Sequence, residues 1–205
     1  MHAALTTVYG IADPAAAPVE AAGRTDLEIA RQICVLSGVA ATRFDDRLAD
    51  LQEAVAEEYA HRVPDDLSDR VAPGVPDMLE ALAARDGLRL SLLTGNIETV
   101  ARLKLRAAGL GQWFEPGQGG FGSDHEDRTR LPAIARRRAG MRARPYPRAK
   151  TIVIGDTPRD IACARADGVR CVAVAGGPYP VEALSDADAV VSDARSLLSA
   201  LDRLL

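Results

Sequence analysis

Residues 151–160 place the strongest constraint on the fold of this chain. They open with a short apolar run at 152–154, which predicts a buried strand. Gly155 breaks the run, Asp156 follows at the carboxyl end of the expected strand, and Pro158 is typical of the first turn of a helix. A strand that leads directly into a helix is a unit from which parallel sheets are built. This segment therefore predicts an α/β fold.

The same turn carries two carboxylates, because Asp160 follows Asp156 by about one helical turn. Hard divalent cations take oxygen ligands and keep some of their waters. In open α/β sheets, ligands bind at the carboxyl ends of the strands. We therefore expect Asp156 and Asp160 to bind a metal ion. The alternative is that Asp156 only caps the helix that follows it.

The rest of the chain divides near residue 70. Residues 1–70 predict helices only, including one that starts at a capping box in residues 25–28 and one at 44–61. From residue 71 onwards, helical and short apolar segments alternate. We expect strands at 88–93, 120–121, 150–154, 170–174 and 189–191, with helices between them. Residues 71–205 should therefore form a parallel sheet with helices on both faces.

The composition is that of an ordinary globular protein, with 47% hydrophobic and 26% charged residues. A net charge of −4 argues against nucleic acid or a membrane surface as an electrostatically bound partner. Cys34, Cys163 and Cys171 show no C-x-x-C spacing, and we recognise no leader or long apolar span. We therefore expect reduced thiols in a cytoplasmic protein. The sequence leaves the oligomeric state open.

A second unit of strand, turn and helix passes through Thr94, Gly95 and Asn96. Thr94 supplies a hydroxyl, Gly95 lets a ligand approach the backbone closely, and Asn96 is a favourable N-cap. A helix N-terminus presents free N–H groups, so a phosphate suits this turn. A cation beside an anion site is the arrangement that phosphate chemistry requires. A helix merely capped by Asn96 is the alternative.

A third motif is the stretch at residues 122–132, which contains two candidate cations. Arg128, or else Arg130, would balance the charge of a phosphate. His125 stands between acids and is expected at the surface. The three arginines at 136–138 are expected to form a solvated helix face.

In this order, the motifs at 93–96, 128–130 and 155–160 make the chain resemble the haloacid dehalogenase superfamily, and most of all its phosphoglycolate-phosphatase-like branch with a helical cap. The resemblance implies a Rossmann-like core at 71–205 and a small α-helical cap at 1–70. It also implies Mg²⁺-dependent hydrolysis of a small phosphorylated metabolite through an aspartyl-phosphate.

The resemblance further implies roles for individual residues. The implied site comprises Thr94, Gly95, Asn96, Arg128 and Arg130 for phosphate, Arg24 for a substrate anion approached from the cap, and Asp156 and Asp160 for Mg²⁺, with Thr94, Arg128 and Asp156 counted as catalytic. The basic position is usually Lys in this family. Arginine keeps the charge but is bulkier and forked, which changes the geometry offered to a phosphate.

The first motif of that family is an apolar strand ending in D-x-D-x-T or D-x-D-x-V, and its first Asp is the nucleophile. Nothing before residue 71 fits this pattern. The stretch at 186–190 matches it, but precedes an apolar pair and is expected to be a turn into an edge strand. We therefore expect the first core strand to be missing between 88–93 and 150–154. The segments beside it would lack ladder partners, and the chain would be destabilised or paired non-natively.

We also expect the chain to begin inside the first cap helix, so an N-terminal truncation, or a start codon placed too far downstream, is the expected explanation. The alternative is a pseudoenzyme that binds phosphate or a partner without turnover. A haloacid dehalogenase is a weaker alternative, because those enzymes need no metal and the turn at 156–160 is acidic.

Overall fold

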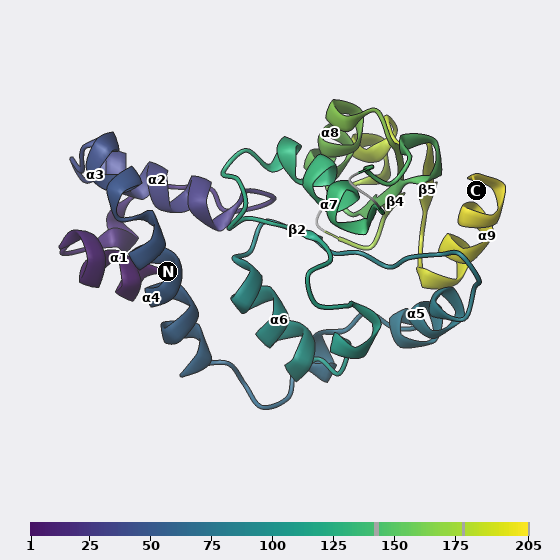
Figure 1. Ribbon diagram of the computed structural model, residues 1–205, viewed down its shortest axis with the longest axis horizontal. Coiled ribbons are helices and arrows are strands. Elements are labelled where there is room, and N and C mark those ends of the chain that lie inside the picture. The colour runs from purple at the N-terminus through teal and green to yellow at the C-terminus, as the bar shows by residue number, and fades with distance from the viewer. Residues whose placement is uncertain (142–143, 178, 205) are drawn as a thin grey trace.

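The computed structural model describes residues 1–141, 144–177 and 179–204. It has an α/β architecture in which helices come first and strands alternate with helices afterwards. The helices α1 to α4 gather at one end of the molecule, and the C-terminal helix α9 lies at the opposite end (Figure 1).

The amino-terminal region is entirely helical, as expected. It comprises α1 (His2–Tyr9), the 3-10 turn η1 (Pro14–Ala16), α2 (Asp26–Leu36), α3 (Ala41–Asp46) and α4 (Leu48–Ala60). Its core includes Leu5, Ile33 and Leu51, none of which is more than 2% exposed. The single helix expected at 44–61 is wrong, because the backbone leaves the helical conformation at Arg47, with φ −111° and ψ 16°.

Each of the five expected strand segments contains a strand, although the one expected at 88–93 is much shortened, and the strands form two separate parallel sheets. The strands are β1 (Leu93–Thr94), β2 (Gly120–Phe121), β3 (Ile152–Gly155), β4 (Arg170–Val174) and β5 (Ala189–Val191). β1 pairs with β2, and β3, β4 and β5 pair in that order. Within the described chain, no ladder joins β1 to β3.

Helices cover both faces of the three-stranded sheet, as the alternating pattern predicts. The remaining helices are α5 (Val75–Ala83), α6 (Glu98–Ala107), α7 (Leu131–Ala139), α8 (Pro158–Asp167) and α9 (Ala194–Leu204), with 3-10 turns η2 (Ser68–Arg70), η3 (Gly111–Trp113), η4 (Arg128–Arg130), η5 (Arg148–Lys150) and η6 (Val181–Leu184). Ile161 of α8 packs on the face that carries Cys171, whereas Leu82 and Leu197 pack on the face that carries Val172. Neighbouring residues of a strand point to opposite faces, which explains this division.

The strand expected at 88–93 is wrong for residues 88–92, because the regular strand begins only at Leu93. Before that point, the carbonyl of Leu92 accepts a hydrogen bond from the N–H of Gly120 at 2.9 Å. β2 begins at Gly120, so it offers nothing to pair with the preceding residues. An apolar run adopts strand structure only where a second backbone completes its hydrogen bonds.

The expectation that the arginines at 136–138 form a solvated helix face is wrong for Arg136, which is only 7% exposed. Its guanidinium forms two hydrogen bonds with the carboxylate of Asp167, at 2.5 and 2.9 Å, and thereby joins α7 to α8. Burial alone would raise the pKa of Asp167, but hydrogen bonds and positive charge from Arg136 and Arg148 outweigh it and lower that pKa. Arginine suits such a buried site because its planar fork binds both carboxylate oxygens.

The three cysteines are free thiols, as expected, and all are buried. Burial raises the pKa of Cys34 and of Cys163 to about 11, and that of Cys171 to about 12. In the described part of the chain, none of the helices has the length and apolarity that crossing a bilayer requires.

Candidate active site at the carboxyl ends of β1 and β3

The turn after β3 is built by its own residues. The Thr157 hydroxyl accepts a hydrogen bond from the N–H of Asp160, and the Asp160 carboxylate accepts one from the N–H of Thr157 at 3.1 Å. This reciprocal capping box starts α8. Glycine is required at position 155, because a Cβ there would lie 2.3 Å from Cγ of Asp160.

The two acids of this turn have different surroundings. Oδ2 of Asp160 accepts hydrogen bonds from the N–H groups of Asp156 and Thr157, so this acid holds the turn together. Asp160 is 5% exposed. Asp156 is exposed, and within the described residues its carboxylate forms no hydrogen bond or ion pair. Of the two predicted metal ligands, Asp156 is therefore the one whose carboxylate has no partner among the described residues.

Arg128 lies at this turn and Arg130 does not. Nη2 of Arg128 donates to Oδ1 of Asp160 at 2.6 Å, and Nη1 donates to the carbonyl of Gly23 at 3.2 Å. Its Nε is buried and has no partner among the described groups. The side chain of Arg130 is 70% exposed, and its closest ion-pair contact is 3.9 Å from Asp127. The structure thus distinguishes between two cations that the sequence left open.

The turn after β1 is capped by a distant residue. Oδ2 of Asp26 accepts from the N–H of Ile97 at 2.8 Å, and the Asp26 carboxylate also accepts from Nδ2 of Asn96. Lys104 donates to Oδ1 of Asn96 at 2.8 Å. The N-cap of α6 is Ile97 rather than Asn96, so the expected Asn96 cap is wrong. A carboxylate of the helical region occupies the positive end of α6, where we expected a phosphate.

Gly95 meets the protein's own backbone. A Cβ at Gly95 would lie 2.2 Å from the carbonyl oxygen of Arg24, and the carbonyl of Gly95 accepts from the N–H of Asp26 at 2.7 Å. The sequence predicted that a ligand would approach the backbone of Gly95 closely. In the structure, the backbone of the helical region makes that approach. Next to it, the hydroxyl of Thr94 accepts a 3.2 Å hydrogen bond from the N–H of Asn96.

Residues 23–26 also contact the other two motifs. The hydroxyl of Thr25, which is fully buried, donates to the carbonyl of Glu126 at 2.6 Å. A Cβ at Gly23 would lie 2.4 Å from Cδ of Arg159, the residue before Asp160. This short segment therefore brings together the turn after β1, the loop before α7 and the start of α8.

Arg24 precedes α2, and its guanidinium pairs with Glu28 in the first turn of that helix, while its Nε is buried without a partner in the described structure. A cavity of about 410 Å³ lies beside Glu28, between α2 and the start of α8. Arg31, Arg128 and Arg159 contribute positive charge to its wall, and Glu28, Glu126 and Asp127 contribute negative charge. Sequence reasoning missed Asp26 and Arg159, because their partners lie far along the chain.

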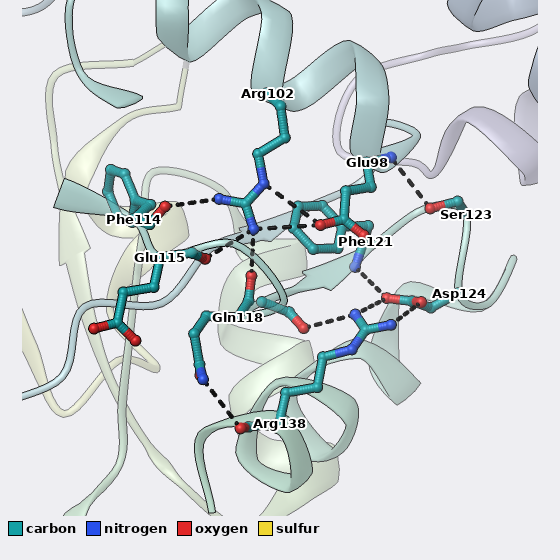
Figure 2. Close-up of polar contacts among 10 residues, drawn as sticks. Glu98, Arg102, Phe114, Glu115, Gln118, Phe121, Ser123, Asp124 and Arg138 are labelled. Atoms are coloured by element: carbon teal, nitrogen blue, oxygen red, sulfur yellow. Dashed lines mark hydrogen bonds and ion pairs between the residues drawn. The ribbon is translucent and has the colours of Figure 1, made fainter. Parts of the chain in front are cut away.

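Two arginines hold the segments on either side of β2 (Figure 2). Arg102 donates to the carbonyls of Phe114, Glu115 and Gln118 at 2.9–3.1 Å. Arg138 forms two 2.6 Å hydrogen bonds with the Asp124 carboxylate. Both guanidinium groups lie over the Phe121 ring, 5.3 and 5.8 Å from its centroid. These contacts fix the segment before β2 and the start of the loop that leads from β2 to Arg128.

A family model described as haloacid dehalogenase-like hydrolase matches residues 4–165. The chain belongs to this family. The predicted resemblance is thus confirmed at the level of the family, for which Mg²⁺ dependence is typical.

Among curated proteins, the phosphoglycolate phosphatase of Rhodospirillum rubrum is 36% identical over 149 residues. The match covers 71% of this chain and 59% of the relative, so the chain spans about three-fifths of the relative's length. A solved haloacid dehalogenase-like family hydrolase from Streptococcus pneumoniae aligns with a TM-score of 0.53 and 15% identity, over 98% of this chain and 88% of that one. That likeness concerns the fold alone.

The donor groups present fit Mg²⁺ in part. This ion is commonly held by one or two carboxylates and keeps several waters. Asp156 meets that need, whereas Asp160 already accepts hydrogen bonds from Arg128 and from the backbone of its turn. The described residues contain no group of three or more His, Cys, Asp or Glu side chains that could hold a metal by themselves.

Proposed function

We propose that these residues form the phosphate- and metal-binding half of an Mg²⁺-dependent phosphatase site that acts on a small phosphorylated metabolite. The observation that carries the proposal is the exposed, unpaired carboxylate of Asp156 at the carboxyl end of β3, one turn from the Arg128–Asp160 pair. The family assignment and the phosphoglycolate phosphatase relative support the same reaction class.

In this proposal each residue acts through its own chemistry. Asp156 holds the cation, which supplies Lewis-acid stabilisation of phosphate charge when bound. The hydroxyl of Thr94 and the backbone of Gly95 bind phosphate oxygens. Arg128 adds positive charge, and Asp160 orients that guanidinium through a 2.6 Å hydrogen bond. Arg24 would approach the substrate from the helical region.

An aspartyl-phosphate also needs a free carboxylate as nucleophile, and the described residues do not provide one beside Asp156. Asp26 is bound to the start of α6. In the matching stretch at 186–190, Asp188 accepts from the N–H of Cys171 at 2.7 Å and pairs with Arg165. It therefore holds β5 beside β4, in agreement with a turn into an edge strand. The proposal requires an aspartate from outside the described residues.

Binding and turnover test separate parts of the proposal. We expect the 205-residue protein to bind inorganic phosphate only with Mg²⁺ present, as measured by calorimetry, and to hydrolyse p-nitrophenyl phosphate no faster than buffer. Asp156→Asn should weaken the Mg²⁺-dependent binding by roughly tenfold or more. The exposed acid Asp186 gives a matched control, since Asp186→Asn should change nothing. Binding that ignores Mg²⁺ or Asp156→Asn would contradict the proposal.

A second candidate is a protein of the same fold that binds a phosphorylated ligand or partner without turnover. The position of Asp26 favours it, because a carboxylate already fills the positive end of α6. Hydrolysis of p-nitrophenyl phosphate by the pure protein, abolished by Asp156→Asn, would refute this candidate.

A further inference from the structure

One long stretch of the chain contains no acidic residue. Residues 128–155 include nine arginines and lysines and neither aspartate nor glutamate. Because the whole chain has a net charge of −4, the other residues carry an excess of thirteen negative charges. A cationic segment in an acidic protein is a candidate surface for an anionic partner. The ion pairs within the structure decide which of its cations remain available.

Three of these arginines are used inside the protein. Each forms an ion pair of 2.5–2.6 Å with a carboxylate: Arg128 with Asp160, Arg136 with Asp167, and Arg138 with Asp124. These pairs join separate segments of the fold, and the positive charge of each is already balanced. They therefore offer nothing to a partner.

Four further cations of the stretch are exposed: Arg137, Arg144, Arg148 and Lys150. Among the described residues, only Arg148 of these four forms an ion pair, at 3.3 Å from Asp167. The Asp167 carboxylate is already paired with Arg136, and the side chain of Arg148 is 61% exposed. Four positive charges therefore face solvent without a full counter-charge.

The exposed cations lie on one continuous surface beside the end of α7. The N–H of Arg144 donates to the carbonyl of Met141 at 3.0 Å, and a Cβ at Gly140 would lie 2.0 Å from the carbonyl oxygen of Arg144. The N–H of Tyr146 donates to the carbonyl of Arg136 at 2.8 Å, so the chain folds back along α7. The turn η5 follows, and β3 begins two residues after it. This surface is therefore at the amino end of β3, opposite the candidate active site.

The uncharged residues of the same surface favour a protein partner. Met141 is 68% exposed, the highest value among the exposed large hydrophobic side chains of the described chain, and Tyr146 is half-buried. Methionine, tyrosine and arginine are enriched where proteins bind one another. At one edge, the exposed Asp86 lines the same cavity as Lys150 and offsets part of the charge. The combination suits a ligand that carries both carboxylates and an apolar side chain.

The charge of the whole molecule argues for a short ligand. Nucleic acid is charged along its whole length. Beyond the cationic surface it would meet a protein with an excess of negative charge, and like charges repel. A short acidic segment can be confined to the cationic surface. The charge distribution therefore favours an acidic peptide over nucleic acid.

We propose that Arg137, Met141, Arg144, Arg148 and Lys150 form a basic surface that docks a short acidic segment of a protein partner. The carboxylates of that segment pair with the exposed cations, and one apolar side chain packs on Met141. The basic surface and the turn that carries Asp156 lie at opposite ends of β3. The inference is therefore independent of the proposed function.

The probe is a fluorescently labelled peptide in which two glutamates stand on each side of a central leucine. Fluorescence anisotropy should show saturable binding to the 205-residue protein. The affinity should fall by roughly tenfold between about 0.02 M and about 0.2 M salt, because exposed charges are screened. A peptide with glutamine in place of each glutamate should not bind. Alanine in place of the leucine should weaken binding by roughly threefold or more.

Three variants locate the surface. Arg144→Glu replaces an attraction by a repulsion and should weaken binding by roughly tenfold or more. Arg137→Glu should act in the same direction at a second exposed side chain. Arg195→Glu is the matched control, because Arg195 is exposed, forms no ion pair among the described residues and follows the carboxyl end of β5. The Tm of each variant shows whether the fold is retained.

Four results would overturn the inference. The first two are equal binding of the glutamine peptide and equal effects of Arg144→Glu and Arg195→Glu. Binding of an oligothymidylate of the same charge, as tight as that of the peptide, would assign the surface to nucleic acid. Salt-sensitive self-association that Arg144→Glu abolishes, measured by analytical ultracentrifugation, would assign it to a second copy of the chain, whose residues 65–69 include three exposed acids.

Discussion

The turns after β1 and β3 come from the same sequence pattern but are stabilised in different ways. After β3, Thr157 and Asp160 cap α8 within four residues of each other. After β1, the start of α6 is capped by Asp26, which lies 71 residues from Ile97. The first turn is capped locally, whereas the second takes its cap from the helical region that is docked on it.

The strands that precede these two turns also differ, in their length and in how completely they are paired. β3 is a four-residue strand with a complete ladder to β4, whereas β1 has two residues. Both follow apolar runs, so hydrophobicity does not explain the difference. The availability of a neighbouring backbone does, because each buried N–H and C=O group needs a partner.

The largest change in the free energy of unfolding is expected at the buried Arg136–Asp167 pair, which holds α7 on α8, the helix with the locally built cap. Arg136→Met leaves the Asp167 carboxylate buried beside a single, more exposed arginine, and should lower the free energy of unfolding by about 3–5 kcal/mol. Urea denaturation measures this change. Arg137→Met, at the exposed neighbouring position, should cost less than about 0.5 kcal/mol. If the two variants lose the same stability, the Arg136–Asp167 pair does not stabilise the packing of α7 on α8.

Hydrogen exchange measures the contrast between the strands directly. Amides of β4, which pairs on both sides, should exchange at least about a hundredfold more slowly than those of residues 90–92. Mass spectrometry of peptides from the two segments provides the measurement. Similar protection in both would mean that residues 88–92 have a backbone partner in solution.

The distant cap of α6 should make a smaller contribution. Asp26→Ala removes the acceptor for the N–H of Ile97 and for the amide of Asn96, and should destabilise the protein by about 1–2 kcal/mol. Asp13→Ala removes an exposed cap of the short turn η1 and should cost less. Thermal unfolding compares the two. If Asp13→Ala costs as much, the docking of the helical region does not depend on Asp26.

The smallest expected effect is the onset of a loss of stability just above pH 9.0. The pKa of Cys171 rises from 9.0 to about 12 on burial, so between these values the unfolded chain loses a proton that the folded one keeps. Stability is therefore full below pH 9.0 and falls as pH rises towards 12. Cys171→Ala should flatten this slope in denaturation curves recorded across that range. An unchanged slope would assign the alkaline loss to other groups.

Sequence alone determined the features that depend on neighbouring residues. Gly10 ends α1 in the left-handed conformation, with φ 74°, Thr25 caps α2 within the segment where a capping box was predicted, and Pro158 begins α8 as its residue type predicts. The order of strands and helices and the acidic turn after β3 follow in the same way. Each depends on hydrogen bonds that span a few residues, so the sequence pattern specifies them.

Only the tertiary structure decided the features that depend on distant partners. It placed Arg128 rather than Arg130 beside Asp160, buried Arg136 against Asp167, and put Asp26 where a phosphate was expected. It also left residues 88–92 without a ladder. In each case the partner lies far along the chain, and its position depends on how whole elements pack, which no local pattern encodes.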